Sequence, residues 1–186
     1  MRRTRARGGV LEAQRSADER NMDTFSTTRL RASKLSIDDL PDLVQLHLDE
    51  DVSRFLGGVR TPDATADYLE TNLRHWTEHG FGLWTIRTAT GEFLGRAGLR
   101  RIEVEGAPEL EIAYTFARSA WGRGYATEIA EALVQTWTAQ TTEPSLVGVV
   151  MKGNRPSERV LLKSGFSYER DAVFHGEACG VFRRVR

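Results

Sequence analysis

Cysteine is almost absent from this 186-residue chain, in which Cys179 is the single thiol. One cysteine cannot form an intrachain disulfide, and the four histidines do not combine with it in a zinc-ligand spacing. The composition therefore suits a reducing, cytoplasmic compartment and gives no metal site.

The chain also lacks net charge and long apolar runs. It has 26 basic and 26 acidic side chains, so no global field attracts nucleic acid or an anionic membrane. No apolar run approaches the roughly 20 residues of a membrane span, and the N-terminus lacks the apolar segment of a secretory signal. We expect a soluble, unexported protein without nucleic-acid or membrane partners.

Residues 1–24 differ in composition from the rest of the chain. They contain six arginines, almost no large apolar residues and no hydrophobic period, which predicts a disordered tail. A basic arm that contacts RNA is the alternative interpretation. Residues 25–186 have the length of one domain with a single core and show no internal repeat or linker.

A glycine-containing loop, Trp121 to Thr127, separates a predicted strand from a predicted helix. In the strand, Leu110 to Phe116, apolar side chains alternate with Glu111 and Thr115 on the other face. The following segment has Ile129, Leu133 and other apolar residues at helical spacing. The first N–H groups of a helix have no internal partner and lie at the positive end of its dipole, so this order predicts a phosphate or pyrophosphate site.

Two common phosphate-binding motifs do not fit this loop. A P-loop needs Lys and Ser/Thr after its second glycine, where this chain has Tyr125 and Ala126. A dinucleotide fingerprint needs Gly or Ala three residues after Gly124, where this chain has Thr127. The strand also comes too late in the chain to open a dinucleotide-binding unit.

The remaining pattern predicts a single α/β domain whose mixed, mostly antiparallel sheet is accompanied by about four helices. Caps at Ser36, Thr61 and Asn154 begin three of the helices. The buried strand Leu146–Met151 should pair in parallel with the strand ending at Phe116, because a helix connects them. Five other strands are expected. One begins near Thr27, and the others span Phe81–Thr88, Glu92–Arg100, Phe166–Phe174 and Cys179–Val185.

The loop resembles motif A of the GNAT acetyltransferase superfamily, Q/R-x-x-G-x-G/A, in which Gly124 and Ala126 match the last two positions. Trp121 replaces the usual Gln or Arg, and the run from Trp121 to Glu128 is similar to the W-G-x-G-Y-A-T-E form of the RimJ/RimL branch. Asn154 to Phe166 resembles the C-terminal signature of the same branch. The resemblance extends from about Thr27 to Val185.

This resemblance implies an acetyl-CoA-dependent N-acetyltransferase that transfers the acetyl group directly in a ternary complex. A non-catalytic acyl-CoA sensor or scaffold is the alternative. The acceptor can be a small-molecule amine, such as an amino acid, a polyamine or an amino-sugar antibiotic, or a protein N-terminus, and a homodimer is left open. By the same resemblance, the residues that contact the cofactor are Trp121, Gly122, Arg123, Gly124, Tyr125, Ala126, Thr127, Asn154 and Ser157.

Transfer to an amine needs a base and a proton for the leaving thiolate. Glu111 matches the branch position that takes a proton from the amine, directly or through water; a solvated surface carboxylate is the structural alternative, and Glu109 is the second candidate. Ser157 matches a position beside the thiol, although it and Asn154 also suit a helix N-terminus. An α-amine with a pKa near ~7.8 is easier to deprotonate than a lysine near ~10.4, which weakly favours the former as acceptor.

The remaining aromatic and reactive side chains receive no catalytic role. Tyr114, Tyr125 and Tyr168 are interpreted as core or cofactor-packing residues. Trp76, Trp84 and Phe55 are candidates for the acceptor pocket, with a core position as the alternative for the two tryptophans. The segment Val52 to Gly58 is predicted as a loop that walls the acceptor site, as the resemblance implies.

Overall fold

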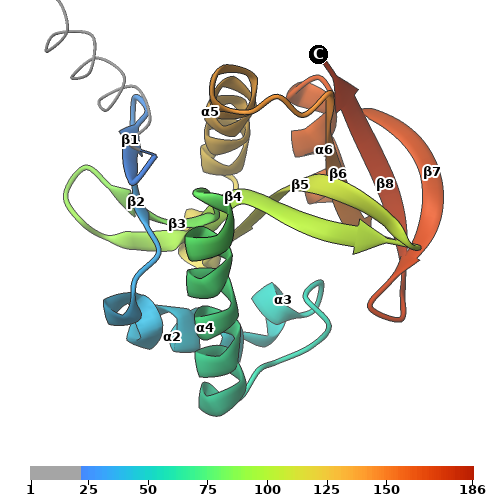
Figure 1. Cartoon of the computed structure of the whole chain (residues 1–186). Coiled ribbons are helices and arrows are strands. Elements are labelled where there is room, and N and C mark those ends of the chain that lie inside the picture. The colour runs from blue at the N-terminus through green and yellow to red at the C-terminus, as the bar shows by residue number, and fades with distance from the viewer. Residues whose placement is uncertain (1–21) are drawn as a thin grey trace, which may run out of the picture.

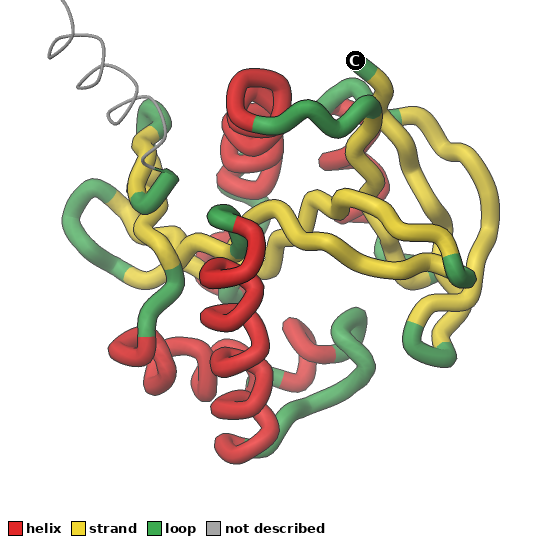
Figure 2. Tube along the Cα trace, in the orientation of Figure 1, coloured by secondary structure: helices red, strands yellow, loops and turns green. Residues whose placement is uncertain are grey.

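The computed structural model describes residues 22–186, which form an α/β domain (Figures 1 and 2). The disordered tail or basic arm predicted for residues 1–24 lies, up to residue 21, outside the described residues. The strands are β1 Thr24–Ser26, β2 Leu30–Lys34, β3 Leu83–Thr88, β4 Phe93–Val104, β5 Ala107–Phe116, β6 Ser145–Met151, β7 Ser167–Phe174 and β8 Glu177–Val185. The helices are α2 Leu40–Leu48, α3 Glu50–Ser53, α4 Pro62–His79, α5 Tyr125–Gln140 and α6 Arg155–Lys163, with 3-10 turns η1 Ile37–Asp39 and η2 Arg118–Ala120.

Within residues 22–186, the strands form one eight-stranded sheet in the order β1-β2-β3-β4-β5-β6-β8-β7. Every neighbouring pair is antiparallel except β5 and β6, which α5 connects in parallel. The mixed sheet and its parallel pair confirm the predicted fold class. Among these residues no helix combines the length and apolar character needed to cross a bilayer.

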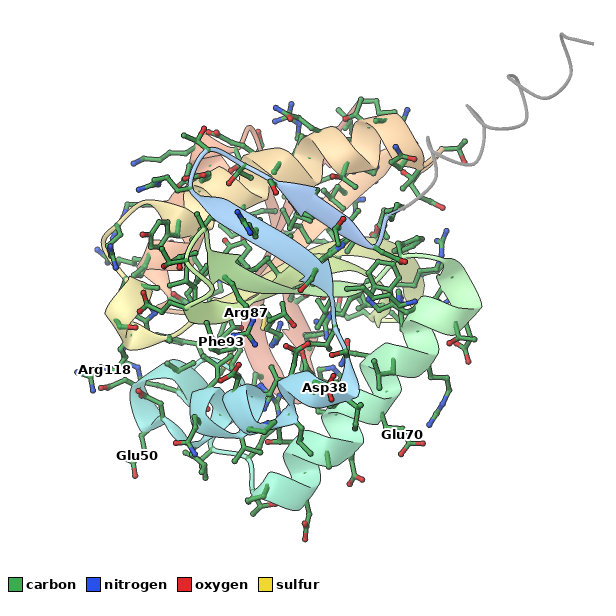
Figure 3. The ribbon with its side chains drawn as sticks, turned by 90° about the vertical axis from the view of Figure 1, so that its left-hand side faces the viewer. Asp38, Glu50, Glu70, Arg87, Phe93 and Arg118 are labelled. Carbon is green, nitrogen blue, oxygen red and sulfur yellow. The ribbon has the colours of Figure 1, made fainter. Side chains whose placement is uncertain are left out.

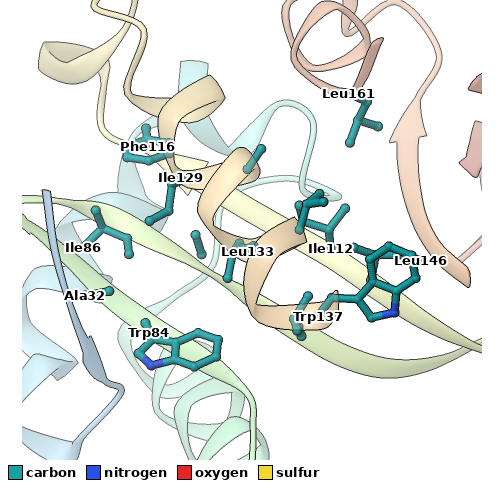
Figure 4. Packing of buried hydrophobic residues seen from close by; sticks show 14 of the residues in the cluster. Ala32, Trp84, Ile86, Ile112, Phe116, Ile129, Leu133, Trp137, Leu146 and Leu161 are labelled. Carbon is teal, nitrogen blue, oxygen red and sulfur yellow. The ribbon is translucent and has the colours of Figure 1, made fainter. Parts of the chain in front are cut away.

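Helices cover both faces of the sheet. In Figures 1 and 2, α5 and α6 lie over one face, and α2, α3 and α4 lie over the other. Figure 4 shows Ile129 and Leu133 of α5 against the sheet residues Ile86 and Ile112, within the larger buried cluster. A second cluster, which includes Ala113, fills the space beneath α2 and α4. Strand β5 is therefore buried on both faces, so Glu111 does not point into solvent.

The predicted helix ends follow from local hydrogen bonds. The Asp39 carboxylate accepts from the backbone N–H of Ser36 at 3.0 Å, and Thr61 Oγ1 accepts from the N–H of Ala64 at 3.2 Å. Gly80 ends α4 in the left-handed conformation at φ +73°, which costs glycine little. On the α2 side, Arg87 of β3 pairs with Asp42 at 2.6 Å, and Figure 3 shows Arg87 beside Phe93. Side-chain caps and ion pairs thus fix these helices on the sheet.

Three local expectations need correction. The fold begins before Thr27, because β1 starts at Thr24 and the Met22 carbonyl accepts the indole N–H of Trp84 at 2.7 Å. Part of the segment predicted as a loop is helical, since Asp49 caps the short helix α3 through the N–H groups of Asp51 and Val52. The turn before β5 lies at Glu105 and Gly106, both at positive φ, which leaves Pro108 within the strand.

Candidate active site

The loop between β5 and α5 has the backbone conformation that its glycines allow. Gly122 and Gly124 adopt φ values of +72° and +78°, in the left-handed region that side chains with a Cβ avoid. Trp121, about half exposed, donates its indole N–H to the carbonyl of Phe116 at 2.7 Å. This bond ties the loop back to the end of β5 and fixes where α5 begins.

The first turn of α5 provides unpaired backbone donors. The first hydrogen bond of the helix runs from the N–H of Glu128 to the carbonyl of Gly124 at 3.1 Å. The N–H groups of Tyr125, Ala126 and Thr127 have no hydrogen-bond partner in the described part of the chain. These groups lie at the positive end of a 16-residue helix, so the loop suits an anion.

An ion-pair cluster supports the loop from the N-terminal strands. Glu128 accepts from the Thr27 hydroxyl at 2.5 Å and from the backbone N–H of Arg29 at 2.9 Å, and its second oxygen pairs with Arg29 Nε at 2.6 Å. Arg29 also donates to the carbonyl of Arg123 at 2.8 Å. Sequence reasoning missed this support, because the partners lie about a hundred positions apart.

A cleft of about 590 Å³ extends from the glycine loop across β5. It is lined by both predicted catalytic residues and by every predicted cofactor contact except Arg123, whose guanidinium lies over the Tyr125 ring. Glu109, the second candidate base, is instead paired with Arg183 at 2.6 Å. The residues that line the cleft include Glu111, Trp121, Gly122, Gly124, Tyr125, Ala126, Thr127, Asn154 and Ser157.

The cleft passes between β5 and β6, where the two parallel strands diverge. They pair in register at Glu111 and Val147, and the residues beyond that point on both strands line the cleft. Gly148 lets α6 approach β6, because a Cβ there would lie 2.5 Å from Leu161 Cδ1. The divergence exposes strand backbone to an extended ligand.

Ser157 lies at the start of α6 beside a buried tyrosine hydroxyl. The Tyr114 and Ser157 hydroxyls are 2.9 Å apart, and Tyr114 also donates to the Ser157 carbonyl at 3.1 Å. Burial raises the pKa of Tyr114 well above its usual value although the hydrogen bond to Ser157 lowers it, so the phenol stays protonated. The Ser157 N–H donates to Asn154 Oδ1 at 3.3 Å, so Asn154 caps α6 as the structural alternative expected. The position of Tyr114 beside Ser157 was not foreseen.

Glu111 is buried, with 4% of its surface exposed, so the surface-charge interpretation is wrong. Arg100 donates to Glu111 Oε2 through Nη2 at 2.5 Å and through Nε at 3.1 Å. Burial lowers the pKa of Arg100, but the neighbouring Glu111 and Tyr68 raise it more, and Arg100 stays charged. Oε1 of Glu111 has no hydrogen-bond partner in the described part of the chain, and Glu111 lines the cleft.

A second buried arginine lies at the same end of the cleft. Arg96 stands opposite Thr115 in the β4–β5 pairing, as Arg100 stands opposite Glu111, so all four share one face of the sheet. Its guanidinium carbon is 5.1 Å from the Tyr68 ring centroid. Burial, followed by the repulsion of Arg100 and Arg60, lowers the pKa of Arg96 to about 10.

The apolar wall of this end comes from α3 and the segment after it. Val52, Phe55 and Leu56 line the cleft, which agrees with the expectation for the segment from Val52. Trp76 and Trp84 do not line it, because both are buried in the core. At the surface, Arg118 before the glycine loop pairs with Asp51 of α3 at 2.6 Å, and Figure 3 shows Arg118 at the same edge of the molecule as Glu50.

These features agree with a family comparison, in which residues 29–167 match the acetyltransferase (GNAT) domain. The chain belongs to the GNAT acetyltransferase family. It is an acetyl-CoA-dependent acetyltransferase, as the glycine loop implied.

Related sequences support this assignment. The chain is similar to the uncharacterized protein YkkB of Bacillus subtilis, with 31% identity over 73% of this chain and 80% of that protein. It is also similar to the uncharacterized N-acetyltransferase p20 of Bacillus licheniformis, with 25% identity over 80% of this chain and 84% of that protein.

Solved GNAT structures share the fold. An acetyltransferase of Agrobacterium tumefaciens superposes with a TM-score of 0.78 at 26% identity, covering 89% of this chain and 96% of that one. RimL, an α-N-acetyltransferase of ribosomal protein L7/L12 in complex with coenzyme A, gives a TM-score of 0.71 at 18% identity and covers 87% and 97% of the two chains. At that identity the likeness to RimL concerns the fold.

Proposed function

We propose that this GNAT enzyme acetylates a primary amine by direct attack on acetyl-CoA within a ternary complex. The proposal rests on one observation: the glycine loop and the buried carboxylate of Glu111 line the same cleft. A non-catalytic acyl-CoA sensor needs the loop but has no use for a buried carboxylate at the far end. Glu111 therefore favours an enzyme over a sensor or scaffold.

The glycine loop fits the pyrophosphate of acetyl-CoA. The free N–H groups of Tyr125, Ala126 and Thr127 converge at the helix N-terminus. A Cβ at Gly122 would meet no atom within 4 Å. Glycine is therefore needed there for its positive φ and not to avoid a clash within the protein. The diverging strands β5 and β6 offer backbone partners to the amides of the pantetheine arm.

Glu111 is the proposed base. Its Oε2 is held by Arg100, which fixes the carboxylate and directs Oε1 to the acceptor or to a bridging water. As the amine nitrogen bonds to the acetyl carbon, its proton passes to Oε1 and the carbon–sulfur bond breaks. The α-amine of a protein N-terminus is about one pKa unit from neutrality at pH 7, a cost of about 1 kcal/mol, so one carboxylate suffices for such an acceptor.

Ser157 is the proposed partner of the departing thiolate. Its hydroxyl can donate to the sulfur once the Tyr114 proton turns from the Ser157 carbonyl to Ser157 Oγ, 2.9 Å away, and the raised pKa of Tyr114 keeps that proton on the phenol. Asn154 holds the Ser157 backbone and so sets the position of the hydroxyl. This arrangement gives Asn154 a positioning role beside its capping role.

We further propose that the enzyme belongs to the RimJ/RimL branch. The support is the run from Trp121 to Glu128 and the segment from Asn154 to Phe166, both of which match that branch. In this structure Glu128 of the run anchors the loop to Arg29, which gives the last motif position a physical role.

The proposal is tested by ligand-dependent melting and by amine-dependent release of CoA. Acetyl-CoA should raise the melting temperature, because a ligand that binds the native state stabilises it by mass action. Desulfo-CoA should act nearly as well, since the loop holds phosphate and not sulfur. A shift with ATP or NAD but with neither CoA form would contradict the site, and CoA release that no primary amine accelerates would contradict the acceptor.

A further inference from the structure

The acceptor end of the cleft contains buried polar atoms that the described residues do not satisfy. Arg96 is 4% exposed, lines the cleft, and has neither a hydrogen bond nor an ion pair within residues 22–186. Its Nε, the Tyr68 hydroxyl and Thr115 Oγ1 are three of the five buried side-chain atoms without a partner in that range. Since buried polar groups are nearly always paired, the two exceptions that line the cleft, Arg96 Nε and Thr115 Oγ1, point to a ligand there.

The charges at this end do not balance. Three guanidinium groups lie close together: those of Arg60 and Arg96 are 4.9 and 5.1 Å from the Tyr68 ring centroid, and Arg100 lies four residues from Arg96 on the same face of β4. Glu111 is the carboxylate that opposes them, and it is already paired with Arg100. Asp51, the other acid that lines the cleft, pairs with Arg118 at the surface. A buried cation without a partner is costly. The unpaired Arg96 guanidinium is therefore explained best by an anion that arrives with the substrate.

We infer that the acceptor is a small amine that also carries a carboxylate, such as a free amino acid, and that Arg96 binds this carboxylate. The inference rests on the proposed amine acetylation and names its substrate class. A guanidinium presents a planar fork that matches a carboxylate, and in a buried site such a bond is strong. Thr115, which lies opposite Arg96 in the strand pairing and also lines the cleft, adds a hydroxyl group without a partner in the described residues.

The same charge excess disfavours other acceptors. Polyamines and amino-sugars enter as polycations, which the arginines repel. For an anionic amine, the positive surroundings also disfavour the ammonium form, so more of the bound amine has lost its ammonium proton to solvent and is neutral when it attacks. Arg96 thus selects the substrate by its carboxylate, while Glu111 acts on its amine.

The first experiment compares amines that differ only in the anionic group. Each free amino acid is paired with its amide, and a series from glycine through β-alanine to 4-aminobutyrate varies the separation between amine and carboxylate. The amide has the less basic amine, so a site indifferent to charge would acetylate the amide faster. We expect kcat/KM to be about 10-fold or more higher for the free acid, with one preferred separation in the series.

The second experiment uses Arg96→Met, which keeps the side-chain length and removes the charge. KM for the amino acid should rise about 10- to 100-fold, the loss expected for one charge-assisted hydrogen bond, while the amide should be affected much less, so that the kcat/KM ratio of acid to amide falls. The melting temperature should hold or rise, because an unpaired buried cation has been removed. Arg101→Met is the matched control on the same strand: its guanidinium pairs with Glu143 outside the cleft, and it should retain the acid preference.

The outcomes separate the two proposals. Equal use of acids and amides, or an acid preference that survives in Arg96→Met, overturns the substrate class while acetylation stands. A clear drop in the melting temperature of Arg96→Met with equal losses for acid and amide would make Arg96 structural and would also overturn it. If acetyl-CoA binds but no amine is acetylated, the proposed function fails and the inference fails with it.

Discussion

The two ends of the cleft are built from different parts of the chain. At the cofactor end, seven consecutive residues from Trp121 to Thr127 provide a loop whose free N–H groups form the site. At the acceptor end, Glu111, Arg96 and Val52 come from β5, β4 and α3, and it is side chains that form the proposed site. The cofactor end is made of backbone and is local in sequence, whereas the acceptor end is assembled by the fold.

This difference separates what the two ends recognise. Backbone N–H groups recognise the phosphate of the cofactor whatever the acceptor is. The same loop can therefore serve enzymes that act on different acceptors. Side chains from several elements can change independently, and they set which acceptor is bound. Substitutions at the acceptor end should therefore alter turnover and specificity, while substitutions in the loop should alter cofactor affinity.

The largest effect is expected for Glu111→Gln. The amide keeps the shape and the contact with Arg100 but cannot take a proton, so kcat should fall about 10²-fold or more. Acetyl-CoA affinity, measured by titration, should stay the same, because the glycine loop is untouched. Raising the pH should restore part of the rate, since more of the amine is then neutral in solution.

Glu109→Gln is the matched control for Glu111→Gln. Glu109 lies two residues earlier on β5 and pairs with Arg183 outside the cleft, so its loss should affect turnover much less. Wild-type turnover of Glu111→Gln between pH 6 and 9 would mean that water and the titration of the amine itself account for deprotonation.

Gly124→Val should act at the cofactor end. Valine at a φ of +78° is strained by roughly 1–2 kcal/mol, and the loop relieves this strain by turning its N–H groups away from the phosphate. We expect the Kd of acetyl-CoA to rise about 5- to 30-fold in a folded protein. The added Cβ would meet only the Arg29 guanidinium, at 3.4 Å, which favours folding of the variant.

Gly91→Val is the control for backbone strain, because it places valine at a positive φ outside the cofactor loop. Gly91 has a φ of +93° in the turn between β3 and β4, and a Cβ there meets nothing within 4 Å. This variant should lose comparable stability but bind acetyl-CoA normally. Unchanged affinity in a folded Gly124→Val protein would place the phosphate elsewhere.

The contrast between the two ends of the cleft also explains which features could be predicted from the sequence. The glycine loop between a strand and a helix and the caps at Ser36 and Thr61 depend on neighbours within a few residues, and they were predicted. The parallel pairing of β5 and β6 followed from the intervening helix.

The contacts between side chains at the acceptor end could not be predicted from local sequence patterns. Alternation placed Glu111 on the face opposite Ile112 but could not reveal that α2, α3 and α4 bury that face. The arginines of β4 became relevant only through strand register, which pairs Arg96 with Thr115 and Arg100 with Glu111. Tyr114 and Ser157 lie 43 positions apart, and no local pattern links them.

A smaller effect is expected from acid, through His47 beneath the acceptor end. Burial, then the charges of Arg96 and Arg60, lower its pKa from 6.5 to about 3. Nε2 accepts from Arg60 at 3.3 Å and Nδ1 contacts Thr65 Oγ1 at 3.2 Å, an arrangement that requires the neutral ring. Because the unfolded chain binds this proton more readily, the stabilisation is complete above pH 6.5 and is lost as the pH falls toward 3.

Between pH 6.5 and 5, His47 should account for about 2 kcal/mol of lost stability. Denaturant unfolding at a series of pH values measures it, and His47→Phe should flatten the pH dependence even if it lowers stability at pH 7. His79→Gln, a change at a partly exposed histidine, should leave the slope unaltered. An equal slope in His47→Phe would assign the acid sensitivity to other groups.

The smallest effect is expected for removal of residues 1–20, and it tests whether the acceptor end alone supplies the preference for anions. This segment is arginine-rich, with few large apolar residues that could enter a core, and an arginine-rich arm could attract acidic substrates by charge alone. If Arg96 supplies the preference, the truncated protein should keep its melting temperature, its acetyl-CoA affinity and its kcat/KM ratio of acid to amide within error. Extending the deletion through Met22 should lower the melting temperature, because the Trp84 indole then loses its acceptor. A truncation at residue 20 that abolished the acid preference while acetyl-CoA binding persisted would move substrate recognition from the cleft to the N-terminal arm.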